Sequence, residues 1–384
     1  MSSATMATVA TVDKKEFVAR LATLNRIVDK KGYVPVLQNI YVGIEPGAVT
    51  LRSTDLEISE LSTIPAATDG VGAVTIPAAM MLKLLRKAPK AADSITLSVD
   101  TEDTALDITC GTLSLHLKGI DAEEFPAMPT VVPDAMLKFE SGELMVALNQ
   151  VLPAISTDET RPLLTGVDFR VNDGVLTLAT ADGFRLAVRK LTIDYTGESF
   201  EAVVPGRMLA EVARELKGQT EPATISFSKE YVKVETETLT VISAPVDGNF
   251  PDYRQIIPAE VASHITFQAS DMLAALSVVE PISKECANIV QLKTDDGNLK
   301  VVATSAEMGT ASQSIPAKIE GEGGHIAFNV KYIKDAIKCV GRNTISMGMN
   351  TWKEPGVFEP VGRYDYVHVL IPMHLDRDKT HSSD

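Results

Sequence analysis

The chain repeats one sequence pattern three times, and no other feature constrains its fold as strongly. A glycine opens an alternating stretch at GAVTLRSTD (47–55), GVLTLATAD (174–182) and GNLKVVATS (297–305). Apolar residues stand two and four positions after each glycine, and they share one face of a strand because strand side chains alternate. The three glycines lie 127 and 123 residues apart, so the sequence predicts three tandem units of similar length.

A second shared segment begins 27 to 29 residues after each of these glycines, and we predict a short strand followed by a helix that starts at a proline or asparagine. The three segments are VTIPAAMMLKLLRKAP (74–89), AVVPGRMLAEVAREL (202–216) and IAFNVKYIKDAIKCV (326–340). Pro77, Pro205 and Asn329 suit a helix start because the first N–H groups of a helix have no partner within it. The apolar stripes predicted to be buried are Met81, Leu84, Leu85, Leu209, Val212, Leu216, Ile333, Ile337 and Val340.

Another helical face precedes each glycine, so every repeat reads strand, helix, strands, strand, helix, strands. Its apolar residues are Phe17, Leu21, Leu24, Val28, Leu144, Leu148, Val151, Ile155, Met272, Leu276 and Val279. Two helices on a mostly antiparallel sheet form an α+β domain of ordinary size. We predict domains at residues 1–131, 132–259 and 260–384, the last with a C-terminal extension from about residue 376.

Composition excludes several classes of protein. The 384 residues include 36 Lys plus Arg against 51 Asp plus Glu, a net charge of −15 that argues against a polycation coating nucleic acid or membrane. Cys110, Cys286 and Cys339 form no C-x-x-C pair, so neither a disulfide framework nor a zinc site is predicted. No run of about 18 apolar residues and no N-terminal targeting pattern is present, so we expect a cytoplasmic protein without a membrane partner, metal or cofactor.

Cations nevertheless gather on equivalent helices of this acidic chain. The second helix carries Lys83, Lys87 and Lys90 in the first repeat, Arg207, Arg214 and Lys217 in the second, and Lys331, Lys334, Lys338 and Arg342 in the third. The first helix adds Lys14, Lys15, Arg20, Arg26, Lys30 and Lys31. One such stripe is ordinarily just a solvated face. Their recurrence favours contact with a duplex backbone, because the stacking aromatics of a single-strand binder are scarce.

Five segments carry motifs of a known family. They are TRPLLTGVDF (160–169), TADGFRLAV (180–188), APVDGNFPDYRQIIP (244–258), FNVKYIKDAIKC (328–339) and YVHVLIPMHL (366–375). Together they resemble the bacterial DNA polymerase III beta subunit, the replicative sliding clamp. The resemblance runs from about residue 7 to 375, in register with the three repeats.

The resemblance implies a DNA polymerase processivity factor that is not itself an enzyme. In this family two chains join head to tail as a homodimer, and the closed ring encircles duplex DNA without sequence specificity and slides along it. Six helices about 10 Å wide would leave a hole of only about 10 Å, whereas twelve leave about 28 Å. One chain therefore cannot surround a duplex, and two can.

The resemblance also implies residues that meet DNA and protein partners. DNA contacts correspond to Lys31, Arg161 and Arg207, and the basic stripes add Lys83, Lys87, Lys331 and Lys334. A groove between the second and third domains would take short apolar motifs from the replicative polymerase alpha subunit, the clamp loader, other polymerases and repair proteins. Its predicted lining is Leu164, Ala181, Gly183, Phe184, Arg185, Leu186, Pro251, Ile256, Val369, Ile371, Pro372 and Met373.

Some positions depart from the family pattern. Ala181, Phe184, Gln255 and His374 replace residues that are common there, and this leaves the peptide preference open, as does the extension 376–384. For the dimer contact, the resemblance implies Leu113 and Leu115 on an edge strand, with Ile282 near their counterpart.

Two other classes of function fit the sequence less well. An enzyme would need a nucleophile elbow, a zinc motif or a phosphate loop, and no such motif occurs; GEGGHIAF (321–328) is a turn leading into a strand. A three-domain adaptor that binds peptides without encircling DNA would explain the groove but not the recurring basic helices.

Overall fold

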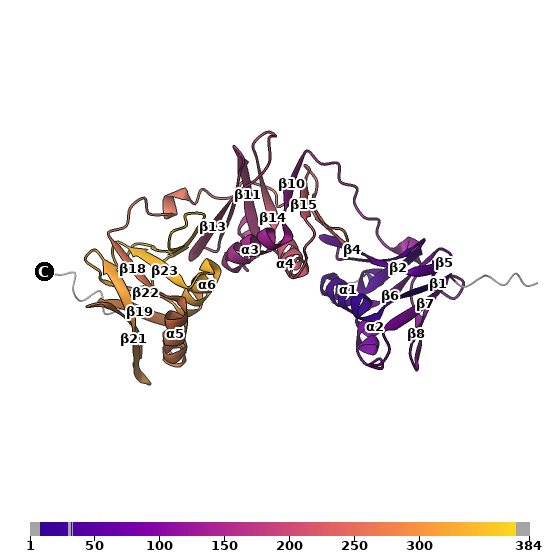
Figure 1. The fold of residues 1–384 in the computed structure, drawn as a ribbon, viewed down its shortest axis with the longest axis horizontal. Coiled ribbons are helices and arrows are strands. Elements are labelled where there is room, and N and C mark those ends of the chain that lie inside the picture. The colour runs from indigo at the N-terminus through magenta and orange to yellow at the C-terminus, as the bar shows by residue number, and fades with distance from the viewer. Residues whose placement is uncertain (1–7, 30–31, 33, 374–384) are drawn as a thin grey trace, which may run out of the picture. The chain divides into compact units, whose positions relative to one another are not determined.

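A computed structural model of the chain describes residues 8–29, 32 and 34–373. The chain packs as two compact units, residues 1–144 with 211–245 and residues 145–210 with 246–384. Along the described sequence, the helices and strands recur three times in the predicted order (Figure 1). The division into domains at residues 131 and 259 stays a prediction, because both units include part of the central repeat.

The first repeat contains β1 (Thr8–Asp13), α1 (Lys14–Ile27), β2 (Asn39–Glu45), β3 (Ala48–Thr54), β4 (Ile58–Pro65), β5 (Ala67–Asp69), β6 (Gly72–Pro77), α2 (Ala78–Leu85), β7 (Ser94–Asp100), β8 (Ala105–Cys110) and β9 (Leu113–Lys118). The second contains β10 (Ala135–Phe139), α3 (Ser141–Val151), β11 (Gly166–Asn172), β12 (Val175–Ala181), β13 (Arg185–Thr192), β14 (Phe200–Pro205), α4 (Gly206–Glu215), β15 (Ala223–Phe227), β16 (Val232–Glu235) and β17 (Leu239–Ser243). The third contains β18 (Ser263–Gln268), α5 (Ala269–Lys284), β19 (Ile289–Asp295), β20 (Asn298–Ser305), β21 (Gly309–Glu320), β22 (His325–Asn329), α6 (Val330–Val340), β23 (Thr344–Met349), β24 (Gly356–Pro360) and β25 (Tyr366–Leu370).

Antiparallel sheets run across the boundaries between repeats. The first unit holds a sheet in the order β5-β1-β7-β8-β9 and another in the order β10-β15-β16-β17-β4-β3-β2-β6. The second unit holds the order β14-β11-β12-β13-β25-β24-β23-β18-β21-β20-β19-β22. Neighbouring repeats therefore join strand to strand, at β17–β4, here called the first junction, and at β13–β25, called the second junction.

The repeated glycines occupy equivalent turns. Gly47, Gly174 and Gly297 directly precede β3, β12 and β20, and their φ angles are 81°, 72° and 75°. This left-handed conformation suits glycine because it lacks a Cβ atom. The shared glycine is thus a requirement of the backbone at one hairpin, which explains why it marks the repeat so clearly.

The predicted helix starts are confirmed. Pro77, Pro205 and Asn329 directly precede α2, α4 and α6, and the Asn329 side chain accepts a 2.9 Å hydrogen bond from the Lys331 N–H. The apolar stripes are buried as predicted, with two exceptions. Leu84 is half-buried, whereas Leu82 of the same helix is buried. Ile155 is also half-buried, since α3 ends at Val151.

Candidate functional site

A row of apolar side chains crosses the second junction on the sheet face that points away from the helices, here called the outer face. Ala181 of β12 lies opposite Leu186 of β13, which in turn lies opposite Val369 of β25. Leu186 and Val369 are buried in one cluster, against which Leu164 and Ala181 are partly buried. Four residues of the predicted groove, from three strands and the segment before β11, are thus brought together as its floor.

Exposed apolar residues stand around this floor. Phe184 is 54% exposed, Ile256 is 38% exposed and Ile371 is 36% exposed, although large apolar side chains are normally covered. The Ile371 N–H donates a 2.9 Å hydrogen bond to the Phe184 carbonyl, so the chain after β25 is tied to the turn before β13. Pro251 is also exposed, whereas Met373 is half-buried and Pro372 is buried. A buried apolar floor with an exposed apolar rim is the chemistry of a peptide-binding groove.

The turn before β13 is held by Asp182. Its side chain accepts hydrogen bonds from the N–H groups of Phe184 at 2.9 Å and Arg185 at 3.0 Å, and Gly183 has a φ of 90° that suits glycine. This geometry places Phe184 on the rim and stacks its ring on Tyr332, with centroids 6.2 Å apart.

Arg185 occupies a different place from the one predicted. It follows Phe184 by one residue, and alternation turns its side chain toward the helix face of the sheet. Its guanidinium donates to Asp182 at 2.9 Å and Asp335 at 2.7 Å, and it lies 4.5 Å from the centre of the Tyr332 ring. These carboxylates raise the pKa of Arg185 in spite of its burial. Arg185 therefore positions the turn from beneath instead of lining the groove.

The segment that follows β17 packs on the outer face and completes the groove. The Val246 N–H donates to the Val203 carbonyl at 2.8 Å, and the buried rings of Phe250 and Tyr253 meet edge to face. Pro251 and Ile256 lie beside these two anchors, which explains how two residues of an irregular segment are held next to the strands.

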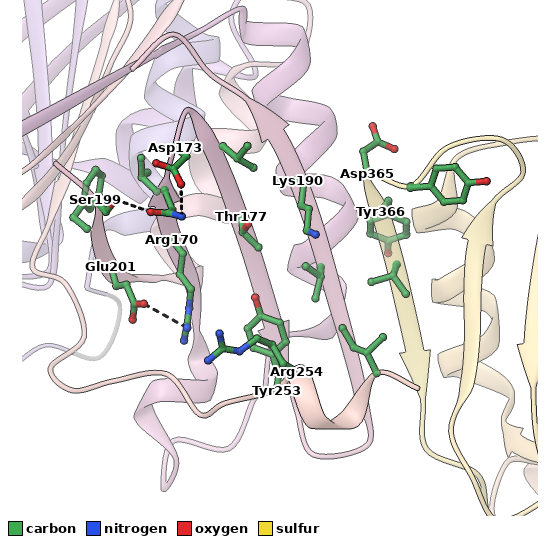
Figure 2. Close-up of a pocket in the computed structure, with 18 of the residues that line it drawn as sticks. Arg170, Asp173, Thr177, Lys190, Ser199, Glu201, Tyr253, Arg254, Asp365 and Tyr366 are labelled. Atoms are coloured by element: carbon green, nitrogen blue, oxygen red, sulfur yellow. Dashed lines mark hydrogen bonds and ion pairs between the residues drawn. The ribbon is translucent and has the colours of Figure 1, made fainter. Parts of the chain in front are cut away.

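A further pocket of about 1010 Å³ lies on the outer face, where β11, β12 and β13 meet the residues before β25. Figure 2 shows Arg170, Thr177, Lys190 and Tyr253 around it, with Arg170 paired to Glu201 at 3.4 Å. This pocket was not predicted from the sequence. One sequence signal could have indicated it. Lys190 lies two residues after Val188 and four after Leu186, so strand alternation places all three side chains on the outer face of β13.

The cations predicted to meet DNA are mostly exposed. Lys83 and Lys87 are exposed in and after α2, Arg207 in α4 and Lys331 in α6. Arg161 is exposed as well, 3.7 Å from Asp158. Lys31 lies outside the described residues.

Lys334 is the exception among these cations. Its ammonium contacts Glu280 of α5 at 2.5 Å, and its side chain is only 18% exposed. The carboxylate neutralises much of its charge, so Lys334 is less available to a phosphate than Lys331.

Two arginines of the predicted stripe on α1 are also engaged, at the first junction. Arg20 pairs with Glu215 at 3.2 Å, and Arg26 pairs with Glu211 at 2.6 Å and with Glu215 at 3.1 Å. Both acids belong to α4. Glu60 of β4 is buried beneath them, and this burial and the neighbouring glutamates raise its pKa to about 8. These α1 cations thus stabilise the junction and do not face solvent freely.

Two of the predicted dimer residues lie on an edge strand of a sheet, and the third lies in a helix. Leu113 and Leu115 are half-buried on β9, which ends its sheet and, among the described strands, pairs only with β8. Ile282 is half-buried in the last turn of α5, a helix that packs against β20 and β21.

Comparison with known families accounts for nearly the whole described chain. Residues 8–129 match the N-terminal domain of the DNA polymerase III beta subunit, residues 138–252 its central domain and residues 254–374 its C-terminal domain. The chain belongs to the DNA polymerase III beta subunit family. The α+β fold of three tandem clamp domains, with two helices per repeat on antiparallel sheets, is thereby confirmed.

Relatives extend over the full length of this match. The beta sliding clamp of Staphylococcus aureus is 26% identical over 373 residues, 94% of this chain and 98% of the relative. That of Synechococcus elongatus is 27% identical over 370 residues, with the same coverage. The solved sliding clamp of Bacillus subtilis has a TM-score of 0.88 at 25% identity, and that of Bartonella birtlesii, bound to griselimycin, has 0.87 at 26%; each covers 96% of this chain and is itself covered completely.

Among the helices that the structure describes, none is long and apolar enough to cross a membrane. No group of three or more His, Cys, Asp or Glu side chains within the described ranges is placed to hold a metal ion.

Proposed function

We propose that this chain is the processivity subunit of a replicative DNA polymerase and has no catalytic activity of its own. Two copies join head to tail into a ring that encircles duplex DNA and slides along it. The groove at the second junction holds short apolar motifs of the polymerase alpha subunit, the clamp loader and other polymerases and repair proteins. The observation that carries this proposal is the match of three clamp domains, in order, over residues 8–374.

Strand pairing within the chain supports the head-to-tail ring. At both junctions the last strand of one repeat, β17 or β25, pairs with the fourth strand of the repeat before it, β4 or β13. This rule leaves β9, the last strand of the first repeat, without a partner. It equally leaves β21, the fourth strand of the third repeat, whose stretch 309–316 pairs on one side with β20 and, within the described residues, with nothing on the other. A second copy supplies the missing pair, β9 against β21.

Weak electrostatics would let such a ring slide. Exposed Lys83, Lys87 and Lys331 can attract phosphates without reading bases, while the net charge of −15 disfavours DNA elsewhere on the protein. A polymerase held in the groove then stays near its primer end through a high effective concentration.

Topology provides the decisive test. The chain is loaded onto nicked circular DNA with a clamp loader, and retention is measured by gel filtration in high salt before and after linearisation. We expect retention on the circle and release from the linear product. A three-domain adaptor or an enzyme predicts no such difference, so equal retention on both forms would reject the ring.

The strand rule has its own test, which needs no DNA. Leu115→Lys places a charge on the open edge of β9, and sedimentation should show a shift from dimer to monomer. Leu56→Lys, which changes an exposed leucine in the turn between β3 and β4, serves as the matched control and should leave the dimer intact. A Leu115→Lys protein that remains fully dimeric would place the contact elsewhere.

A further inference from the structure

A strongly basic pocket lies on the helix side of the second unit, apart from the groove. It has a volume of about 310 Å³, and Gln150 of α3, Lys338 of α6 and Arg189 of β13 line it with Arg342 and Arg363. A neighbouring pocket of about 540 Å³ shares Arg342 and Arg363. Every charged residue that lines either pocket is basic, on a chain with a net charge of −15.

Arg189 distinguishes this pocket from a solvated patch of cations. Arg185, four residues earlier on the same face of β13, is satisfied by two carboxylates of its own. Arg189 instead shares the single carboxylate of Asp365 with Arg363, which leaves an excess of positive charge. Arg189 is only 7% exposed, and its Nε has no hydrogen-bond partner among the described residues. A buried guanidinium N–H without an acceptor is costly, so this site favours an acceptor that enters the pocket.

We propose that this pocket binds an oxyanion of the phosphate class. Guanidinium groups present paired N–H donors that match phosphate oxygens, and Arg189, Arg342 and Arg363 provide three of them in one place. Lys338 adds a fourth cation, against the one carboxylate of Asp365. Helix α6 ends at Val340, and its partial negative end opposes the anion by only about half a charge, which four cations exceed.

The phosphate can come from a free anion or from a nucleic acid backbone. Lys338 and Arg342 continue the α6 stripe that begins at Lys331. A duplex whose backbone contacts this stripe would therefore also reach the pocket. The site itself depends only on its own residues. The assignment of the phosphate to duplex DNA rests on the proposed function.

The test follows the Arg189 Nε–Hε resonance of the full chain by NMR. Sodium phosphate is titrated at constant ionic strength, with chloride as the balancing salt. We expect a saturable shift with phosphate and none with chloride. Arg342→Gln combined with Lys338→Gln should weaken phosphate binding about tenfold or more, because two charge-assisted contacts are lost.

Controls keep the outcome interpretable. Lys318→Gln removes an exposed lysine of β21 that pairs with Glu320 and should not change phosphate binding. Arg189→Lys keeps the charge beside Asp365 but removes Nε and with it the resonance, so its phosphate binding is measured by isothermal titration calorimetry and should also be weaker. If Arg189→Lys fails to fold, the double variant Arg342→Gln with Lys338→Gln still tests the site, because both of its residues are exposed. No saturable shift, or equal affinity in the double variant and the control, overturns the site.

A second arm identifies the source of the phosphate. A short duplex that displaces phosphate and shifts the same resonance assigns a backbone phosphate, whereas a response to phosphate alone assigns a free anion. Either response supports the pocket. If the wild-type chain binds phosphate but is not retained on circular DNA, the proposed ring is rejected and the pocket is not. If the chain is retained on circular DNA but does not bind phosphate, the pocket alone is rejected.

Discussion

The two junctions between repeats use the same strand pairing but differ in what they bury. At the first junction Leu61 of β4 faces Thr240 of β17 on the outer face, and both are half-buried. At the second, Leu186 faces Val369, and a packed segment covers part of the sheet beside them. We therefore expect an apolar partner motif to find a floor at the second junction and not at the first. Strand pairing joins the repeats at both junctions, whereas the side chains on the outer face differ, and on the proposed function these side chains determine which junction binds a partner.

The helix sides of the junctions differ in their titrating groups. The first junction holds Glu60, a carboxyl group whose pKa is raised to about 8. The second holds His368, fully buried and bonded to the Tyr366 hydroxyl at 2.8 Å, and burial with the nearby Arg185 lowers its pKa to about 3. We therefore expect the junctions to respond to pH in opposite directions, which makes each a control for the other.

The largest expected effect is the pH response of the first junction. The raised pKa of Glu60 means that its stabilising protonated form is complete below pH 4.5 and is lost as pH rises through about 8. Opening of β4 and β17 should become easier by roughly 1.4 kcal/mol per pH unit across this window. Hydrogen exchange, corrected for its intrinsic rate, measures this opening, and Glu60→Gln should flatten the slope.

An exposed glutamate provides the matched control for that experiment. Glu45→Gln should keep the wild-type slope, because its carboxyl group is exposed in β2. A wild-type slope that survives in Glu60→Gln would show that another group controls the first junction.

The second junction should respond at the acid end. His368 has a lowered pKa, so its contribution is complete above pH 6.5 and is lost as pH falls toward about 3. The free energy of opening β13 and β25 should fall by roughly 1.4 kcal/mol per pH unit over that range, so that their amides exchange faster. The amides of β4 and β17 should become more protected until about pH 4.5 and then change no further. If both junctions weaken together on acidification, the contrast between them fails.

Arg26→Ala should weaken the first junction by about 2 kcal/mol, because Glu211 and Glu215 lose a shared partner. This expected loss of stability is smaller than for a fully buried ion pair, because Arg26 is partly exposed. Chemical denaturation followed by exchange at β17 measures the loss. Lys15→Ala, on the same helix, should be close to neutral.

Phe184→Ala should weaken binding of an apolar partner peptide by about 1–2 kcal/mol, roughly tenfold, and leave folding unchanged because the ring is largely exposed. Fluorescence anisotropy with a labelled peptide and a melting curve measure the two quantities. Unchanged affinity would place the peptide site elsewhere on the chain.

The smallest effect is expected at the outer face of the first junction. Leu61→Ala removes a half-buried side chain and should cost less than about 1 kcal/mol of stability, with no change in peptide affinity. A loss of peptide affinity in this variant would mean that both junctions bind partners.

The sequence predicted the parts of the molecule that depend on local chemistry. The repeated glycines need a left-handed turn, and Pro77, Pro205 and Asn329 suit a helix start, so each could be identified from its neighbours alone. The groove residues followed from the resemblance, and strand register then brought Ala181, Leu186 and Val369 into one row.

Long-range pairing could not be predicted. Arg20 and Arg26 read as a solvated or DNA-facing stripe, because nothing near them in the sequence indicates that Glu211 and Glu215 lie opposite. Lys334 was assigned to DNA for the same reason, since its partner Glu280 belongs to another helix. A charge pattern shows where cations lie on a helix but not which distant acids they meet.

Because β17 of the second repeat pairs with β4 of the first, a single repeat is not the cooperative folding unit. The first compact unit includes β15, β16 and β17 of the central repeat. Its sheet and the ion pairs at the first junction are therefore completed by residues of the second repeat. A fragment cut at residue 131 would leave β4 as a bare edge and Arg20 and Arg26 without their acids.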